Sequence, residues 1–223
     1  MNISLAHSAE PIIPAVLAGT IEEFNKKLEF ARKIGSAHFD VMDGEFVDGS
    51  CIPIDKWPDK IDVNYSEAHL MVKDPLDYLD KLAAKGIRRA IVHIEDQVDL
   101  EKLKNMAKAV DILLGFAVNP DTDLYKLKPY VETNTYIQLM GVHPGLANQE
   151  MLDYTPSSVN YLRKSTIRRV IISIDGGVTE DNILQLKKNG ADYFVSTHAI
   201  FSTPDWQDNY DKLLAAAKDE VRV

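Results

Sequence analysis

Residues 38–44 read HFDVMDG, and this stretch places an imidazole and two carboxylates at the end of a predicted buried strand. Because side chains alternate between the two faces of a strand, His38 and Asp40 point one way while Phe39 and Val41 point the other. We expect the apolar pair to pack under a helix. The polar pair would face the middle of a sheet or barrel, where an unpaired charge is costly unless a metal ion or a substrate binds it.

Apolar runs typical of strands alternate with periodic segments typical of helices on both sides of this stretch. Strands are expected at residues 12–17, 37–42, 67–72, 89–95, 111–119, 135–145, 168–177 and 192–198. Helices are expected at residues 20–35, from residue 75, at 99–109, 124–130, 157–164 and 180–189, and from residue 206. About eight strand-then-helix units at a spacing of about 25 residues predict the α/β class and a single-domain (β/α)8 barrel over residues 1–223. An open, doubly wound sheet is the alternative.

The composition argues against several kinds of partner. The 223 residues are 45% hydrophobic and 26% charged, with a formal net charge of −9, which opposes binding to nucleic acid or to an anionic membrane surface. The single cysteine, Cys51, cannot form an internal disulfide, so a reducing compartment is the simplest interpretation. The first ten residues lack the basic and apolar regions of a secretion signal, and no apolar run approaches the ~18 residues of a membrane span. We therefore expect a cytoplasmic protein with no membrane partner and no nucleic-acid partner.

Polar residues gather where the predicted strands end. Five of the six histidines lie in or at the ends of predicted strands: His38, His69, His93, His143 and His198. In a barrel these ends form one face, so we expect the histidines to converge there with Asp40 and Asp175. Two imidazoles and two carboxylates suit Zn²⁺, Mn²⁺ or Fe²⁺.

Two of these residues, Asp40 and Asp175, belong to the second and seventh predicted strands, so in a closed barrel they would reach the central cavity from different sides. One aspartate could take a proton from a carbon next to a carbonyl while the other returns a proton on the opposite face, and the product would be an epimer. The alternative is that both are structural, with Asp175 capping the Gly-Gly turn that follows it.

Five motifs in this order resemble those of the ribulose-phosphate 3-epimerases: HFDVMDG, EAHLMV at 67–72, GFAVNP at 115–120, MGVHPG at 140–145 and IDGGV at 174–178. The likeness spans Pro14 to Phe201. It implies a metal-dependent isomerase of the pentose phosphate pathway that interconverts D-ribulose 5-phosphate and D-xylulose 5-phosphate through an enediolate. A sugar phosphate would be its small-molecule partner, and a homo-oligomer its assembly.

The resemblance also implies roles for individual residues. The metal ligands would be His38, Asp40, His69 and Asp175, with Asp40 and Asp175 also the acid/base pair. The ion would be Zn²⁺, with Fe²⁺, Mn²⁺ or Co²⁺ as alternatives. The residues implied as substrate contacts are His69, Met42, Met71, Met140, Gly145, Gly176, Gly177, Thr197 and His198. A methionine at such a position can equally be plain packing.

The chain departs from the family on the side that would hold phosphate. Ala15 stands where the family usually has serine, and Ala147 and Asn148 interrupt a typically glycine-rich loop. Thr197 and His198 replace a small Gly-Ser pair. Two alternatives therefore stay open: an epimerase that acts on a hexulose phosphate or an unphosphorylated ketose, and a barrel that binds a metal and a ligand without turnover.

Overall fold

The structure is a computed structural model and describes residues 10–96, 98–145, 149–165 and 169–218. The chain divides into two compact units. Of the described residues, the first comprises those from 15 to 115, and the second comprises 10–14 and those from 116 to 218. Each unit is described by itself below.

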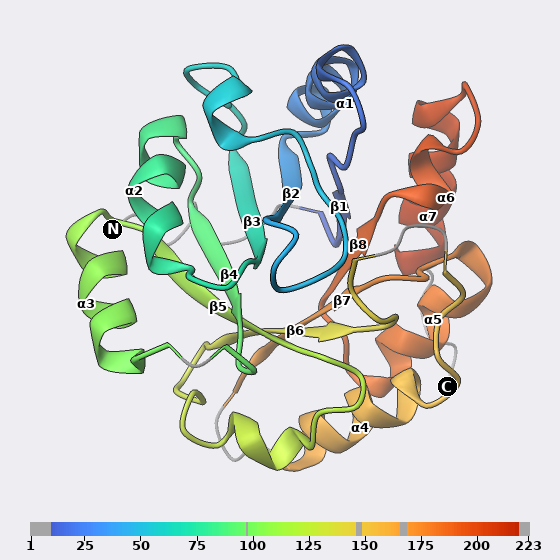
Figure 1. Cartoon of the computed structure of the whole chain (residues 1–223). Coiled ribbons are helices and arrows are strands. Elements are labelled where there is room, and N and C mark those ends of the chain that lie inside the picture. Colours follow the sequence, from blue (N-terminus) through green and yellow to red (C-terminus); the bar gives the residue numbers. More distant parts are fainter. Residues whose placement is uncertain (1–9, 97, 146–148, 166–168, 219–223) are drawn as a thin grey trace. The chain divides into compact units, whose positions relative to one another are not determined.

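The first unit is built from parallel strands with a helix after each of them. Its elements are α1 (Ile21–Ile34), β2 (Ser36–Met42), η2 (Ile54–Lys56), β3 (Tyr65–Met71), α2 (Leu76–Lys85), β4 (Arg89–His93) and α3 (Leu100–Ala109). Strand β3 pairs in parallel with β2 on one side and with β4 on the other. Figure 1 shows these three strands side by side, with α2 and α3 along the outer side of β3 and β4.

Helix α1 shows why the sequence folds this way locally. The Thr20 side chain accepts a hydrogen bond from the Glu23 backbone N–H (3.2 Å) and so caps the helix. The buried face of α1 presents Phe24 to the strand that follows. Phe39 packs against Phe24 and Trp57, with ring centroids 6.0 and 5.0 Å apart. The expected packing of Phe39 under a helix is therefore confirmed.

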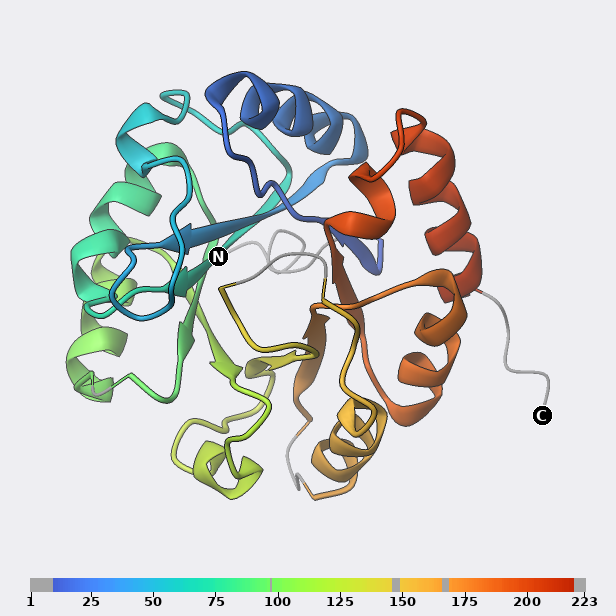
Figure 2. The ribbon, with the colours of Figure 1, turned by 45° about the vertical axis from the view of Figure 1, so that its right-hand side comes forward.

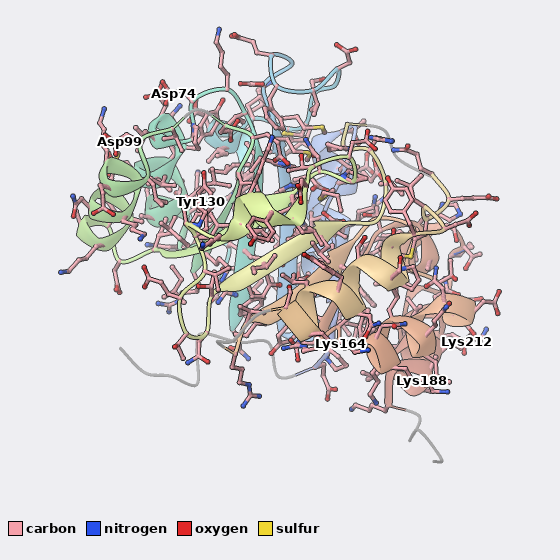
Figure 3. All side chains as sticks on the ribbon, turned by 90° about the horizontal axis from the view of Figure 1, so that it is seen from below. Asp74, Asp99, Tyr130, Lys164, Lys188 and Lys212 are labelled. Atoms are coloured by element: carbon pink, nitrogen blue, oxygen red, sulfur yellow. The ribbon has the colours of Figure 1, made fainter. Side chains whose placement is uncertain are left out.

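The second unit repeats the alternation of strand and helix. Its elements are β1 (Ile12–Pro14), η3 (Leu124–Leu127), β6 (Tyr136–Met140), α4 (Thr155–Ser165), β7 (Ile171–Asp175), α5 (Glu180–Asn189), β8 (Tyr193–Ser196), α6 (His198–Phe201) and α7 (Trp206–Lys218). Strand β7 pairs in parallel with β6 and β8, and β8 pairs with β1. Helices α5 (orange) and α7 (red) lie side by side in Figure 2. Lys164, Lys188 and Lys212 mark the exposed faces of α4, α5 and α7 in Figure 3.

The order of the strands defines the fold class. Strand β5 (Leu113–Val118) contains the boundary between the units, and the sheet has the order β1-β8-β7-β6-β5-β4-β3-β2. Ala15, directly after β1, forms a parallel bridge with His38 in β2. This cyclic order of parallel strands is that of a (β/α)8 barrel, so the predicted fold class is confirmed. The doubly wound alternative is wrong, because that fold reverses its strand order at a switch point. A single domain over residues 1–223 stays a prediction.

Several predicted strands extend too far, among them the strand expected at 12–17, which ends at Pro14. The strand expected to reach residue 145 ends at Met140, and Pro144, which lacks an N–H, and Gly145, with a φ of +101°, do not fit a continued strand. The strand expected to end on His198 ends at Ser196, because the Thr197 backbone turns toward helix (φ −104°, ψ −66°). The Thr197 carbonyl then accepts a hydrogen bond from the Phe201 N–H (2.9 Å).

Other boundaries agree to within a few residues. The weak helix expected at 124–130 is a single 3₁₀ turn, η3. None of the described helices has the length and apolar character needed to cross a membrane.

Candidate metal centre

Three candidate ligands lie together in the first unit: Asp40 and His69 in the carboxyl-terminal halves of β2 and β3, and His38 two residues before Asp40. Asp40 and His69 are register partners across the two strands, and His38 precedes Asp40 on the same face of β2. Asp40 Oδ1 lies 3.5 Å from His38 Nε2 and 3.3 Å from His69 Nδ1. Each of the three residues offers one ligand atom, and these atoms lie within 4.8 Å of one another. Both imidazoles are fully buried, whereas the Asp40 side chain is 11% exposed.

The environment keeps Asp40 ionised. Burial opposes ionisation, but the neighbouring imidazoles of His38 and His69 outweigh it and hold the pKa of the Asp40 carboxyl well below its ordinary value. A buried carboxylate between two imidazoles is a donor set that suits a divalent transition metal. The residues present in this unit therefore fit a metal ion.

Each imidazole has its second nitrogen engaged by another side chain. His38 Nδ1 lies 2.8 Å from Glu67 Oε1, and His69 Nε2 lies 2.8 Å from His93 Nε2. His93 Nδ1 in turn lies 3.2 Å from a carboxylate oxygen of Glu95. Hydrogen bonds to the far nitrogen fix the tautomer and the ring orientation of a metal-binding histidine. The nitrogens that face Asp40 are thereby oriented as ligand atoms.

In the second unit, Asp175 is the last residue of β7 and the register partner of Met140 in β6. Gln138 Nε2 donates a hydrogen bond to Asp175 Oδ2 (2.9 Å), and Gln138 is fully buried. The Gly141 N–H donates to the Asp175 carbonyl (2.6 Å), which continues the pairing of β6 with β7. The carboxylate of Asp175 is therefore held in place by a neighbouring strand.

The two glycines after Asp175 are required by the local fold. Gly176 and Gly177 adopt φ values of +101° and +70°, which L side chains rarely tolerate. A Cβ at Gly177 would lie 2.5 Å from the Met151 backbone N, and one at Gly176 would lie 2.4 Å from a Val142 methyl carbon. The IDGGV motif thus has a structural reason, and substrate contact by these glycines stays a prediction.

The remaining predicted substrate contacts differ in exposure. Met71 and Met140 are buried, Met42, Gly145 and Thr197 are half-buried, and His198 is exposed. Ala147 and Asn148 lie outside the described residues. No bound molecule tests these roles, so they stay predictions.

The predicted gathering of histidines is confirmed for three of them, His38, His69 and His93. The other two strand-end histidines, His143 and His198, are exposed. His143 Nδ1 lies 3.7 Å from a carboxylate oxygen of Asp121.

Four residues around the candidate ligands were not expected from the sequence: Tyr65, Glu67, Arg89 and Gln138. A period of two could have revealed three of them, because Tyr65 and Glu67 share the face of His69, and Gln138 shares that of Met140. Arg89 begins β4, where a charged residue reads as an ordinary strand boundary.

The fold and the buried His-Asp-His cluster define a (β/α)8 barrel with a candidate metal centre at its strand ends. The model of the ribulose-phosphate 3-epimerase family matches residues 11–201, so this chain belongs to that family of carbohydrate epimerases, which are isomerases. The chain is 27% identical to the ribulose-phosphate 3-epimerase of Aquifex aeolicus, over 95% of this chain and 99% of the relative. It is 30% identical to that of Schizosaccharomyces pombe, over 85% and 86%.

Solved structures of other enzymes share the fold. Orotidine 5'-monophosphate decarboxylase from Sulfolobus solfataricus matches 94% of this chain and 98% of its own, with a TM-score of 0.63 at 11% identity. The 3-hexulose-6-phosphate synthase from Salmonella typhimurium matches 93% and 98%, with a TM-score of 0.65 at 13% identity. At such low identity the likeness extends to the fold alone.

Proposed function

We propose that this chain is a metal-dependent 3-epimerase that interconverts D-ribulose 5-phosphate and D-xylulose 5-phosphate in the cytoplasm, within the pentose phosphate pathway. The observation that carries the proposal is the buried cluster of His38, Asp40 and His69 in a chain of this family. The names of relatives that match most of the chain support the same reaction. A sugar phosphate is the partner, and a homo-oligomer is the expected assembly.

The proposed cofactor is one divalent metal ion. We assign four ligands to it: His38, Asp40 and His69, which lie together in the first unit, and Asp175, the last residue of β7 in the second unit. Imidazole and carboxylate donors in this proportion favour Zn²⁺, with Fe²⁺, Mn²⁺ and Co²⁺ as alternatives. When bound, the ion would supply positive charge that stabilises an enediolate.

Asp40 and Asp175 are the proposed acid/base pair. The two imidazoles beside Asp40 lower its pKa and so keep it in the ionised form that a base requires. Gln138 holds one oxygen of Asp175, which restricts the direction in which the other oxygen can receive or deliver a proton. One aspartate takes the proton from C3 on one face and the other returns a proton on the opposite face.

The remaining predicted contacts complete the proposal. His69 and the three methionines Met42, Met71 and Met140 would surround the reacting carbons. The residues proposed for the rest of the sugar phosphate are Gly145, Gly176, Gly177, Thr197 and His198. Backbone N–H groups next to glycines can approach a phosphate closely, which supports this assignment.

The direct test follows the proton at C3. The metal-loaded protein is incubated with D-ribulose 5-phosphate in heavy water, and deuterium at C3 and xylulose 5-phosphate are followed by NMR. We expect both at a rate typical of enzymes, about 1 s⁻¹ or faster. Absence of exchange with every ketose phosphate, with the metal confirmed bound, would contradict an epimerase of such substrates.

A pair of variants separates an enzyme from a binder. Asp175→Asn removes the carboxylate, and we expect it to abolish most of the exchange, roughly 100-fold or more, because it removes a general acid/base. Asp181→Asn is the matched control, since Asp181 is an exposed aspartate in the first turn of α5. A non-catalytic barrel would instead show no exchange in the wild type while keeping its affinity for ligand.

A second candidate is the same chemistry on another sugar, such as a hexulose phosphate or an unphosphorylated ketose. It is favoured by Ala15, which is buried with no polar side chain to offer, and by the exposed imidazole of His198. A substrate panel in the same exchange assay decides between the two. A clear preference for ribulose 5-phosphate would remove the second candidate.

A further inference from the structure

A row of buried polar side chains crosses three neighbouring strands of the first unit behind His38. His38 in β2 is the register partner of Glu67 in β3, and Glu67 is the register partner of Arg89 in β4. Tyr65 lies two residues before Glu67 and so shares its face of β3. None of the four residues is more than 3% exposed. The pairing register of the strands therefore brings a carboxylate, a phenol and a guanidinium to one candidate metal ligand.

Hydrogen bonds join these side chains in a chain that runs from Arg89 through Tyr65 to Glu67. Arg89 donates from Nη1 to the Tyr65 hydroxyl, and the Tyr65 hydroxyl donates to Glu67 Oε2. The other oxygen of Glu67, Oε1, lies 2.8 Å from His38 Nδ1. The Arg89 guanidinium also lies over the Tyr65 ring, 5.6 Å from its centroid, and its Nη1 lies 3.8 Å from Glu67 Oε2. Glu67 thus holds His38 with one oxygen and is itself held through the other.

This arrangement determines which nitrogen of His38 carries the proton. An ionised carboxylate can only accept hydrogen bonds, so the proton must sit on Nδ1 and point to Glu67. The lone pair then lies on Nε2, the nitrogen 3.5 Å from Asp40 Oδ1. Arg89 balances the buried charge of Glu67, which would otherwise be costly in this interior.

We propose that Tyr65, Glu67 and Arg89 are positioning residues that fix the tautomer and orientation of His38 and so set the affinity of the centre for its metal. This inference rests on the proposed function and deepens it. It assigns no chemistry to the three residues in the reaction, because their effect reaches the metal only through His38. His69 differs, since its second nitrogen faces the imidazole of His93 and not a carboxylate.

The test measures metal affinity directly, by titrating Co²⁺ into the metal-free protein against a chromophoric chelator and recording the visible spectrum of the bound ion. Glu67→Gln keeps the shape of the side chain and removes its charge. We expect it to weaken Co²⁺ binding roughly 10–100-fold and to change the spectrum, because loss of the hydrogen-bond partner of a metal-binding histidine typically has this effect. Tyr65→Phe removes one hydrogen bond, so we expect a smaller loss of about fivefold.

Tyr136→Phe is the matched control. Tyr136 begins β6 as Tyr65 begins β3, and it is also buried, but it belongs to the second unit. We expect its Co²⁺ affinity to stay within about twofold of the wild type. An equal loss in Tyr136→Phe and Tyr65→Phe would overturn the inference, because any buried hydroxyl would then have the same effect.

The outcomes also separate this inference from the proposed function. Wild-type protein that binds Co²⁺ together with a folded Glu67→Gln variant of unchanged affinity overturns the positioning role alone. Wild-type protein without affinity for Co²⁺ or Zn²⁺ overturns the metal centre and the positioning role together. If Glu67→Gln does not fold, Tyr65→Phe decides alone, because it keeps both buried charges.

Discussion

Asp96 is a carboxylate that lies almost entirely out of solvent, directly after the turn that follows β4. Its residue is 9% exposed, and within the described part of the chain its Oδ2 has no hydrogen-bond partner. Burial, together with the negative charges of Glu95, Asp43 and Asp74 and against an opposing contribution from His69, raises the pKa of Asp96 to about 7. The unfolded chain releases this proton at a much lower pH. Folding stability is therefore lost as the pH rises from about 4 to about 7.

Asp96→Asn removes this pH-dependent loss. The amide cannot ionise, so we expect the variant to gain stability over the wild type at pH 8, and more at pH 8 than at pH 5. Solvent reaches part of the group, so the difference between the two gains should be on the order of 1 kcal/mol. Urea unfolding of both proteins at the two pH values measures it. Equal gains at pH 5 and pH 8 would show that Asp96 ionises normally in the folded protein.

At the scale of single residues, the sequence predicts the candidate ligands better than the residues that hold those ligands in place. His38 and Asp40 stand out because two polar groups on one face of a buried strand need a partner. Glu67 needs the same reasoning, but its partners are Arg89, 22 positions away, and His38, 29 positions away. Which residues face each other depends on the register between strands, and a single sequence does not specify that register.

Among the elements, α3 depends on the residue that caps its N-terminus, Asp99. The Asp99 carboxylate accepts hydrogen bonds from the backbone N–H groups of Glu101 (3.0 Å) and Lys102 (3.1 Å) at the start of the helix (Figure 3). Asp99→Ala leaves these N–H groups without their cap, so we expect a loss of about 1 kcal/mol in the free energy of unfolding. Thermal or urea unfolding of the purified variant measures it.

Asp74→Ala is the control for this cap. Asp74 is exposed and precedes α2, as Asp99 precedes α3, and the α2 N-terminus has no side-chain cap. We expect its effect to stay within about 0.5 kcal/mol. A loss in Asp74→Ala as large as that in Asp99→Ala would mean that the loss reflects charge near a helix start and not the capping bonds.

The ends of an element are predicted accurately where the sequence contains residues that stop it, such as a capping residue or a glycine. Helix α5 is predicted with its observed bounds because Thr179 begins a capping box and Gly190 ends the helix at a φ of +111°. The strand expected at 135–145 is too long because Val142 is apolar and 7% exposed although it lies beyond β6. An apolar pattern reports burial, and burial continues past the point where strand pairing stops.

At the scale of the whole molecule, the repeat of strands and helices was sufficient to predict the barrel, because eight parallel strands with short helical connections have few ways to pair. The same regularity places the candidate ligands at strand ends. It does not specify which sugar the loops accept, because part of the segment that departs most from the family lies outside the described residues. The fold and the cluster of candidate metal ligands are therefore more predictable from the sequence than the substrate.

Metal binding should stabilise the whole chain, because a ligand that binds only the folded state shifts the unfolding equilibrium. At a free Zn²⁺ concentration of 100 times Kd the gain is about 2.7 kcal/mol. For a chain of this length each kcal/mol raises Tm by about 2–4 °C, so we expect Zn²⁺ to raise Tm by roughly 5–10 °C over the chelator-treated protein. Asp40→Asn should lose this shift, while His143→Ala, which alters an exposed imidazole outside the cluster, should keep it. A full shift in Asp40→Asn would place the stabilising ion somewhere other than the His38–Asp40–His69 cluster.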